Sequence, residues 1–314
     1  MIIIAALNYA KEYARELAQA YPYTLYFGDI WNAIKPDVKF LDNKTVEIPS
    51  LTTTGRVNGD RDTIGTFARN FDNSWESKTL SKHRTWGTLV HPRDIDETNK
   101  VASIANITKV FNEEQKFPEM DAEAISTLYT LKNAQEAITA LSTGAVTSAN
   151  VLTYFDTLMD KMDEARVPQT GRILYCDTFT KTLIDNAKDS ARYLSATDEE
   201  IKRKLSRIDE VAIKSVPSAL MKTAYNFYAG NEQSGQNNGF APKSDAKCVK
   251  MLLIHLSAVI PAISYEFAQL EDPSALSQGK YVYFEESFED LFIYNKKHNA
   301  IQFVVENAPA SGSV

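Results

Sequence analysis

The sequence predicts an α+β protein in which a long, interrupted helix follows a strand-rich segment. Segment 44–90 mixes β-branched and aromatic residues with polar ones and carries glycine-containing turn signals, as antiparallel strands do. A helical spacing of apolar residues then runs through 92–135, with a proline inside it. Strand-like aromatic runs return at 281–305. The chain therefore combines a strand-rich segment, a long helical run and further strands.

The length and composition indicate a folded protein of more than one part. With 314 residues the chain exceeds the usual size of a single core, so we expect two lobes or an extended multi-part subunit. Its 44% hydrophobic and 24% charged composition is ordinary for globular chains. The longest apolar run, Met251–Ile260, is shorter than the ~20 residues that span a bilayer. The apolar start Met1–Leu7 lacks a basic beginning and a cleavage site, so we expect no signal peptide and no membrane partner.

Charge and cysteine content narrow the function classes. Asp and Glu outnumber Lys and Arg by 41 to 34, and the net charge is −7, the opposite of what a specific nucleic-acid binder shows. An acidic protein can, however, surround DNA without adhering to it. Cys176 and Cys248 lie far apart in apolar contexts, so we expect free buried thiols and synthesis in a reducing cytoplasm.

The N-terminal forty residues begin like a helix and continue into the aromatic stretch Tyr21–Phe27. So many aromatic side chains need a surface to pack on, which is either the body of the same chain or a neighbouring molecule. The sequence alone slightly favours the same chain.

Segment 44–90 predicts a long two-stranded excursion. Polar and apolar residues alternate over Thr45–Ile48, and Asn58-Gly59 is a pair favoured in tight turns. Further strand signals come from Trp75–Leu80 and Trp86–Val90. We interpret Lys82, His83 and Arg84 as a polar link between these last two strands. An isolated ribbon is marginally stable in water, so it needs another surface to lie on.

The helical region that follows is expected to start at Asp96, a plausible cap. Pro118 cannot donate to a helical ladder, so it either begins a new helix or kinks a continuous one, and the spacing continues through Asp121. A further helix is expected after Ser148. Downstream we expect a strand at 173–176, a helix from 177, a strand ending before 217, a loop at 231–238, a central strand or pair at 251–263, a closing hairpin at 291–305 and a flexible tail at 308–314.

Motifs for catalysis or cofactor binding are weak. Gly55, Gly59 and Gly65 are too widely spaced for a dinucleotide fingerprint, and no Gly-Lys-Ser/Thr follows them. His83 and His91 have no cysteine near them, so zinc spacing is absent. Acidic pairs such as Glu285-Glu286 adjoin strand residues and are better explained as solvated edge charges. We therefore expect no enzyme, no cofactor and no metal.

Taken in order, several segments resemble the major capsid proteins of tailed bacteriophages with the Hong Kong 97-like fold, in particular those of phages infecting Gram-positive bacteria. No single motif is specific, but the ordered set covers nearly the whole chain. The segments are Thr53–Arg56, Gly59–Asp62, Trp75-Glu76, Arg84, His91–Asn99, Phe117–Ala122, Gly171–Leu174, Val216-Pro217 and the aromatic closing strands.

The resemblance implies an α+β capsid fold with an N-terminal arm, an extended two-stranded loop, a long spine helix, and peripheral and axial domains. The implied divisions are an arm at 1–40, an extended loop at 41–91, a peripheral domain with the spine helix at 92–135, an axial domain at 136–268, a return to the peripheral domain at 269–307 and a flexible tail at 308–314.

The resemblance also implies function and partners. A structural protein would self-assemble into pentamers and hexamers of an icosahedral virion shell around double-stranded DNA, after synthesis and assembly in the host bacterial cytoplasm. Expected partners are a separate scaffolding protein, because the chain begins close to the arm, and portal and head-completion proteins. An encapsulin-like shell around a cargo enzyme is the alternative, and a soluble α+β enzyme is a third.

The candidate site residues fall into two sets, the first at the subunit interface and the second at the start and kink of the spine helix. The first set is Tyr23, Tyr26, Phe27, Arg56, Arg61, Trp75, Lys78, Lys82 and Arg84, and we expect its cations to pair with acidic groups of adjacent subunits. The second set is Asp96, Asn99, Pro118, Glu119 and Asp121.

Overall fold

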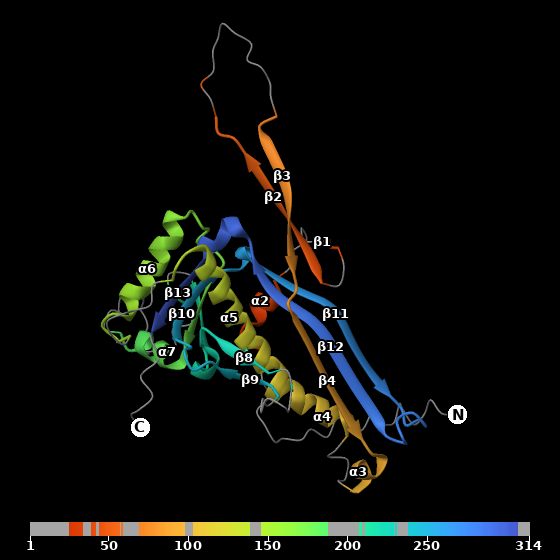
Figure 1. Ribbon diagram of the computed structural model, residues 1–314. Coiled ribbons are helices and arrows are strands. Elements are labelled where there is room, and N and C mark those ends of the chain that lie inside the picture. Colours follow the sequence, from red (N-terminus) through yellow and green to blue (C-terminus); the bar gives the residue numbers. More distant parts are fainter. Residues whose placement is uncertain are drawn as a thin grey trace.

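One long helix and three antiparallel or mixed sheets organise the chain, and a two-stranded ribbon projects from this body (Figure 1). The computed structural model describes residues 25–33, 39–41, 44–56, 58, 69–97, 103–138, 146–187, 207–208, 211–228, 230 and 238–306. Within them, no helix combines the length and apolar character needed to cross a bilayer.

The projecting ribbon consists of β2 (Thr45–Thr53) and β3 (Phe71–Thr79), with the short β1 (Lys39–Phe40) paired to β2. The register runs from Thr45 opposite Thr79 to Thr53 opposite Phe71. At the end of the ribbon nearest the body, Val46 and Ile48 point to one side, as residues two apart in a strand do, and pack on the body. The predicted excursion is therefore present, and its turn signal at Gly59 lies outside the described residues.

The polar link predicted at 82–84 is wrong. These residues begin β4 (Lys82–Val90), which leaves the ribbon and pairs with β12 (Tyr281–Ile293), from Val90 opposite Tyr281 to Lys82 opposite Glu289. With β11 (Val259–Glu271) they form the sheet β11-β12-β4. Residues 82–84 form a strand because half-buried and exposed side chains alternate strictly along β4. This is the pattern of a strand with one covered face.

The long helical region starts later than predicted. Asp96 lies inside the short α3 (Pro92–Glu97), and the cap of α4 (Ile104–Phe111) is Ser103, whose Oγ accepts a hydrogen bond from the backbone N–H of Asn106 at 3.4 Å. The π-helical turn η1 (Asn112–Lys116) then joins α4 directly to α5 (Phe117–Gln135). Pro118 occupies the first turn of α5. It lacks an N–H and its ring would clash in a regular helix, so the wider turn before it lets the helix continue.

The five-stranded sheet has the order β13-β10-β5-β7-β6 and lies between two helical layers. α6 (Val151–Glu164) and α7 (Thr178–Asp185) pack on one face with Leu174, Met251 and Val304. α5 and the short α2 (Gly28–Trp31) pack on the other face. Its strands are β5 (Arg172–Asp177), β6 (Arg207–Ile208), β7 (Val211–Val216), β10 (Cys248–His255) and β13 (Ile301–Glu306).

Several local predictions in this region are confirmed. The strand at 173–176 is β5, and the helix after it is capped by Asp177, whose Oδ1 accepts from the backbone N–H of Thr180 at 2.7 Å. β7 ends directly before Pro217, and the segment 251–263 belongs to two strands, β10 and β11. A small pair, β8 (Tyr225–Phe227) and β9 (Phe240–Pro242), lies beside the long helix, and most of the predicted loop between them falls outside the described residues.

The closing hairpin predicted at 291–305 is wrong. β12 and β13 are separated by the 3-10 turn η6 (Asn295–Ala300) and enter different sheets, because β13 pairs with β10 from Cys248 opposite Glu306 to Ile254 opposite Ile301. The last strand is buried along most of its length and completes the five-stranded sheet. The tail at 308–314 lies outside the described residues.

Candidate functional site

One face of the ribbon is an exposed apolar stripe. The register places Pro49 opposite Trp75 and Thr53 opposite Phe71, with Leu51 between them on the same face. Leu51, Phe71 and Trp75 are 61%, 53% and 52% exposed. We call Pro49, Leu51, Phe71 and Trp75 the ribbon stripe. Contiguous exposed apolar side chains mark sites of protein–protein contact, so the stripe is the candidate interaction surface.

The sheet β11-β12-β4 carries a second exposed apolar patch. Leu89 of β4, Phe267 of β11 and Phe284 of β12 share the face that points away from the long helix, and they are 51%, 36% and 39% exposed. The rings of Phe267 and Phe284 lie 6.3 Å apart. We call these three residues the sheet patch.

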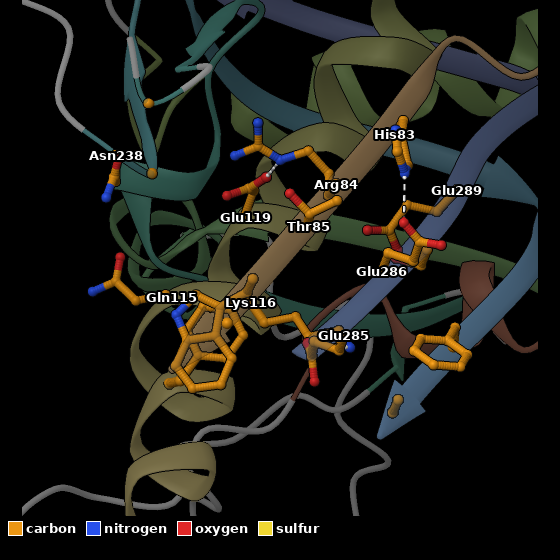
Figure 2. Close-up of a pocket in the computed structure, with 18 of the residues that line it drawn as sticks. His83, Arg84, Thr85, Gln115, Lys116, Glu119, Asn238, Glu285, Glu286 and Glu289 are labelled. Atoms are coloured by element: carbon orange, nitrogen blue, oxygen red, sulfur yellow. Dashed lines mark hydrogen bonds and ion pairs between the residues drawn. The ribbon is translucent and has the colours of Figure 1, made fainter. Parts of the chain in front are cut away.

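The opposite face of the sheet is joined to the long helix by ion pairs. Lys82 Nζ lies 3.0 Å from Glu123 Oε1, and Arg84 Nε lies 2.5 Å from Glu119 Oε1 (the second pair is drawn in Figure 2). Residues two apart on a strand, and residues four apart on a helix, are both about 6–7 Å from each other. The spacing of the two cations on β4 therefore matches the spacing of the two acids on α5, and both ion pairs can form side by side. We call this set the β4–α5 seam.

The same two cations also reach the β8 segment. Arg84 donates from a guanidinium nitrogen to the backbone carbonyl of Tyr228 at 2.9 Å, and the ammonium of Lys82 lies 4.4 Å from the centre of the Phe227 ring. Each cation therefore ties β4 to two other elements. A few residues along, Lys116 of η1 pairs with Glu285 at 3.1 Å.

A groove of about 640 Å³ runs beside the seam, between β4, η1 and the residues around Asn238 (Figure 2). Its charged side chains are paired with each other, as in Arg84 with Glu119 and Lys116 with Glu285. Among the residues the structure describes, no three His, Cys, Asp or Glu side chains gather as a metal site would require. We interpret the groove as a contact region between these elements, in which the ion pairs hold the elements together.

A group of buried carboxyls lies where the ribbon meets the body. Glu123 of α5 is 1% exposed, and Glu289 and Asp290 of β12 are also buried. Burial raises the pKa of Glu123 to about 8, Lys82 opposes this shift, and the negative charges of Glu289 and Asp290 add to it. Asp290 accepts hydrogen bonds from both the N–H and the hydroxyl of Ser81, at 3.0 and 2.9 Å.

The described end of the aromatic stretch, residues 25–27, packs on its own chain. Phe27 is fully buried, its ring lies 4.8 Å from that of Tyr175, and Tyr26 is half-buried against the same core. The carboxylate of Asp121 accepts from the backbone N–H of Tyr26 at 3.0 Å and of Phe27 at 2.9 Å. The assignment of Phe27 to a subunit interface is therefore wrong, and Asp121 holds the arm and does not mark a helix start. The sequence signal that could have indicated this role is an acidic residue, Asp121, on the apolar face of a predicted helix.

The remaining predicted residues are spread along the chain. Trp75 and Arg56 are exposed, as an interface requires, and Lys78 pairs with Glu76 at 2.6 Å on its own strand. Lys82 and Arg84 have their acidic partners within the chain, which corrects the expectation that neighbouring subunits supply them. Glu119 belongs to the seam. Tyr23, Arg61 and Asn99 lie outside the described residues.

Comparison with known proteins finds likeness in structure alone. No family model matches the chain, and no curated protein matches it. A structure of Mycobacterium phage Che8 matches with a TM-score of 0.61 at 12% identity, covering 94% of this chain and 95% of the other. The capsid of cyanophage P-SCSP1u gives 0.62 at 11% identity, over 94% and 92%, and the mature capsid of bacteriophage PhiM1 gives 0.66 at 11% identity, over 94% and 91%. Over nearly its whole length, this chain therefore has the fold seen in bacteriophage capsid structures.

Proposed function

We propose that this chain is a structural major capsid protein of a tailed bacteriophage, which self-assembles into pentamers and hexamers of an icosahedral shell around double-stranded DNA. The observation that carries the proposal is the ribbon stripe, which exposes Leu51, Phe71 and Trp75 on an arm projecting from a body with the capsid fold. A monomeric enzyme has no use for such an arm, whereas a shell subunit uses it to hold its neighbour.

The partner of the ribbon stripe is the sheet patch of the next copy. Both are exposed apolar surfaces on strands, and sheets pack face to face at about 10 Å through such side chains. Leu89, Phe267 and Phe284 offer a surface of the same kind as the stripe and lie on the face away from the long helix. Repeated over many copies, modest apolar burial at about 25 cal/mol per Å² yields a stable shell.

The capsid proposal extends to organisation and partners. The divisions are an arm at 1–40, an extended loop at 41–91, a spine-helix segment at 92–135, an axial domain at 136–268 and a peripheral return at 269–307. We assign the chain to virions of a phage of a Gram-positive host, assembled in the bacterial cytoplasm with scaffolding, portal and head-completion proteins. The net charge of −7 suits an inner surface that holds DNA without specific contact.

The test is expression of the chain together with its neighbouring genes, followed by negative-stain microscopy. Uniform closed shells containing DNA are the expected result, and a compact monomer at high concentration would refute the proposal. DNA-free shells that co-purify with a cargo enzyme would support the encapsulin-like alternative. Uniform native-size shells from the chain alone would refute the separate scaffolding protein.

A further inference from the structure

The ribbon stripe carries a cation at the end of β3 that lies away from the body. Arg69 is exposed, and its guanidinium lies 4.8 Å from the centre of the Phe71 ring. Its Nε donates to the backbone carbonyl of Phe71 at 3.2 Å, and its Nη2 donates to the side-chain oxygen of Asn73 at 3.3 Å. Phe71 and Asn73 are two apart on β3, so both side chains lie on the stripe face. The ribbon therefore holds a positive charge in place against its apolar face.

The sheet patch ends in an acid. Glu271 is the last residue of β11, is exposed, and stands in one row across the sheet with Val282 of β12 and Leu89 of β4. Phe267 lies four residues earlier in the same strand, so its side chain shares the face of Glu271. Among the residues that the structure describes, neither Arg69 nor Glu271 forms an ion pair. Each surface thus presents one uncompensated charge, and the two charges have opposite signs.

The two surfaces also match in length and in the order of their groups. Phe71 and Trp75 are four residues apart on β3. Phe267 and Glu271 have the same separation on β11, and four residues of strand span about 13 Å. When Trp75 lies over Phe267, the Phe71 ring and the guanidinium stacked on it therefore reach Glu271. Apolar contact at one end and an ion pair at the other can form together.

The charges at the opposite end of the same sheet face favour one direction of docking. Phe288 lies at that end, its ring stacks on His83, and the ammonium of Lys44 lies 5.2 Å from the ring centre. Glu286, the acid nearest to them on this face, is paired with His83 at 3.3 Å. A ribbon laid the other way round would bring Arg69 towards Lys44, and like charges brought together at an interface oppose docking.

We propose that Arg69 of one copy pairs with Glu271 of the next copy, and that this contact sets the direction and register in which the ribbon lies along β11. The inference rests on the proposed function, because it takes the sheet patch of a second copy as the partner of the ribbon stripe. Apolar attraction is non-directional and tolerates sliding, whereas an ion pair forms at one position. An exposed pair adds little affinity, so its role is alignment.

The test is a charge swap in the full chain, expressed with its neighbouring genes and scored by counting closed shells in negative-stain microscopy. Arg69→Glu sets two acids against each other, so we expect at least about tenfold fewer shells, and Glu271→Arg should give a similar loss. The double variant restores opposite charges and should return the count to within about twofold of the native chain. Unchanged counts in both single variants, or a double variant no better than either, would overturn the pairing.

Two controls separate this contact from folding and from the capsid proposal. Asp72→Arg makes a charge change of the same size at an exposed position on the other face of β3, so its shells should form as in the native chain. A loss as large as that of Arg69→Glu would contradict the pairing. Urea unfolding of all unassembled variants should match the native chain, because the changed side chains are exposed.

The neutral variants Arg69→Gln and Glu271→Gln cover the case in which a reversed charge prevents folding. Each removes the same ion pair, so each should lower the shell count, and combining them should lower it no further. Losses that multiply in the combined variant would show that the two residues act separately and would overturn the pairing. A native chain that forms no shells refutes the proposed function itself, whereas native shells that tolerate the charge swap refute this contact alone.

Discussion

The carboxylate of Asp121 accepts a hydrogen bond from the backbone N–H of Phe27 at 2.9 Å, and this bond joins the N-terminal arm to the long helix 94 residues away in sequence. Phe27 and Asp121 are both fully buried, so water cannot replace either partner of this hydrogen bond. Phe27 is thereby part of the core of its own chain.

Removing that acceptor should destabilise the fold. Asp121→Ala leaves the N–H groups of Tyr26 and Phe27 unpaired, and we expect the free energy of unfolding to fall by about 2–4 kcal/mol. Urea unfolding of the unassembled chain measures it. Asp160→Ala, on the exposed side of α6, is the control and should change stability by less than about 0.5 kcal/mol.

The ribbon stripe should affect assembly and leave folding intact. Trp75→Asp places a charge on the exposed apolar face, so we expect this variant to form no shells. Its free energy of unfolding should stay within about 0.5 kcal/mol of the native value. Ser74→Asp places the same charge on the neighbouring exposed position of the other face and should assemble normally. If microscopy counts equal numbers of shells for the two variants, the ribbon stripe is not part of the subunit interface.

The β4–α5 seam should affect folding. Arg84→Glu sets two carboxylates against each other and removes the bond to the Tyr228 carbonyl, so we expect a loss of about 2 kcal/mol in the free energy of unfolding. The double variant Arg84→Glu with Glu119→Arg should recover part of it, and the difference is read from a double-mutant cycle. Arg56→Glu, an exposed cation on the ribbon, serves as the control. Absence of any recovery would show that the ion pair is not what Arg84 contributes.

The stability of the chain should depend on pH through Glu123. Its pKa is about 8 in the folded state against an ordinary value of 4.5, so between these two pH values the unfolded state binds fewer protons than the folded state. This group therefore lowers the free energy of unfolding as pH rises from about 4.5 to 8. Glu123→Gln removes that dependence, so its advantage over the native chain should grow across this range and level off above it, on the order of 5 kcal/mol. Denaturant unfolding at several pH values checks the sign, and an advantage largest at low pH would contradict it.

The two thiols should differ in reactivity. Cys176 is buried, and burial raises its pKa to about 12, so the reactive thiolate is scarce near neutrality. Cys248 is only half-buried, and the ammonium of Lys222 lies 2.9 Å from its sulfur. Native chains should therefore take up one equivalent of a thiol reagent and denatured chains two. Peptide mapping that finds Cys176 modified first would contradict this.

Local patterns were sufficient for many elements. The apolar run before Asp177 and the capping side chain of that residue predict β5 and α7, because both signals lie within a few residues of the structure they specify. The ribbon was predicted in the same way, from alternation and from its need for an outside surface. The likeness to capsid structures agrees with the resemblance read from ordered short segments.

What the sequence did not reveal depends on partners far along the chain. The first three residues of β4, Lys82–Arg84, suggest a link and not a strand because their pairing strand is about two hundred residues away. The acceptor of Ser81 lies 209 positions on. The sequence also did not reveal that β13 pairs with β10, about fifty residues earlier, since a turn of six residues suits a hairpin as well as a change of sheet. Lys82 and Arg84 are expected from the sequence to pair with acids of neighbouring subunits, because nothing local points to their partners Glu123 and Glu119 in the same chain.

The attachment of the ribbon at one end has a mechanical consequence. A pull along β3 is carried into Leu80, Ser81 and Lys82, and from there the two cations of β4 pass it to α5. The π turn just before α5 departs from the regular α-helical hydrogen-bond pattern, and helices bend at such turns. Tension from outside would thus bend the helix near Pro118 before it disturbed the five-stranded sheet.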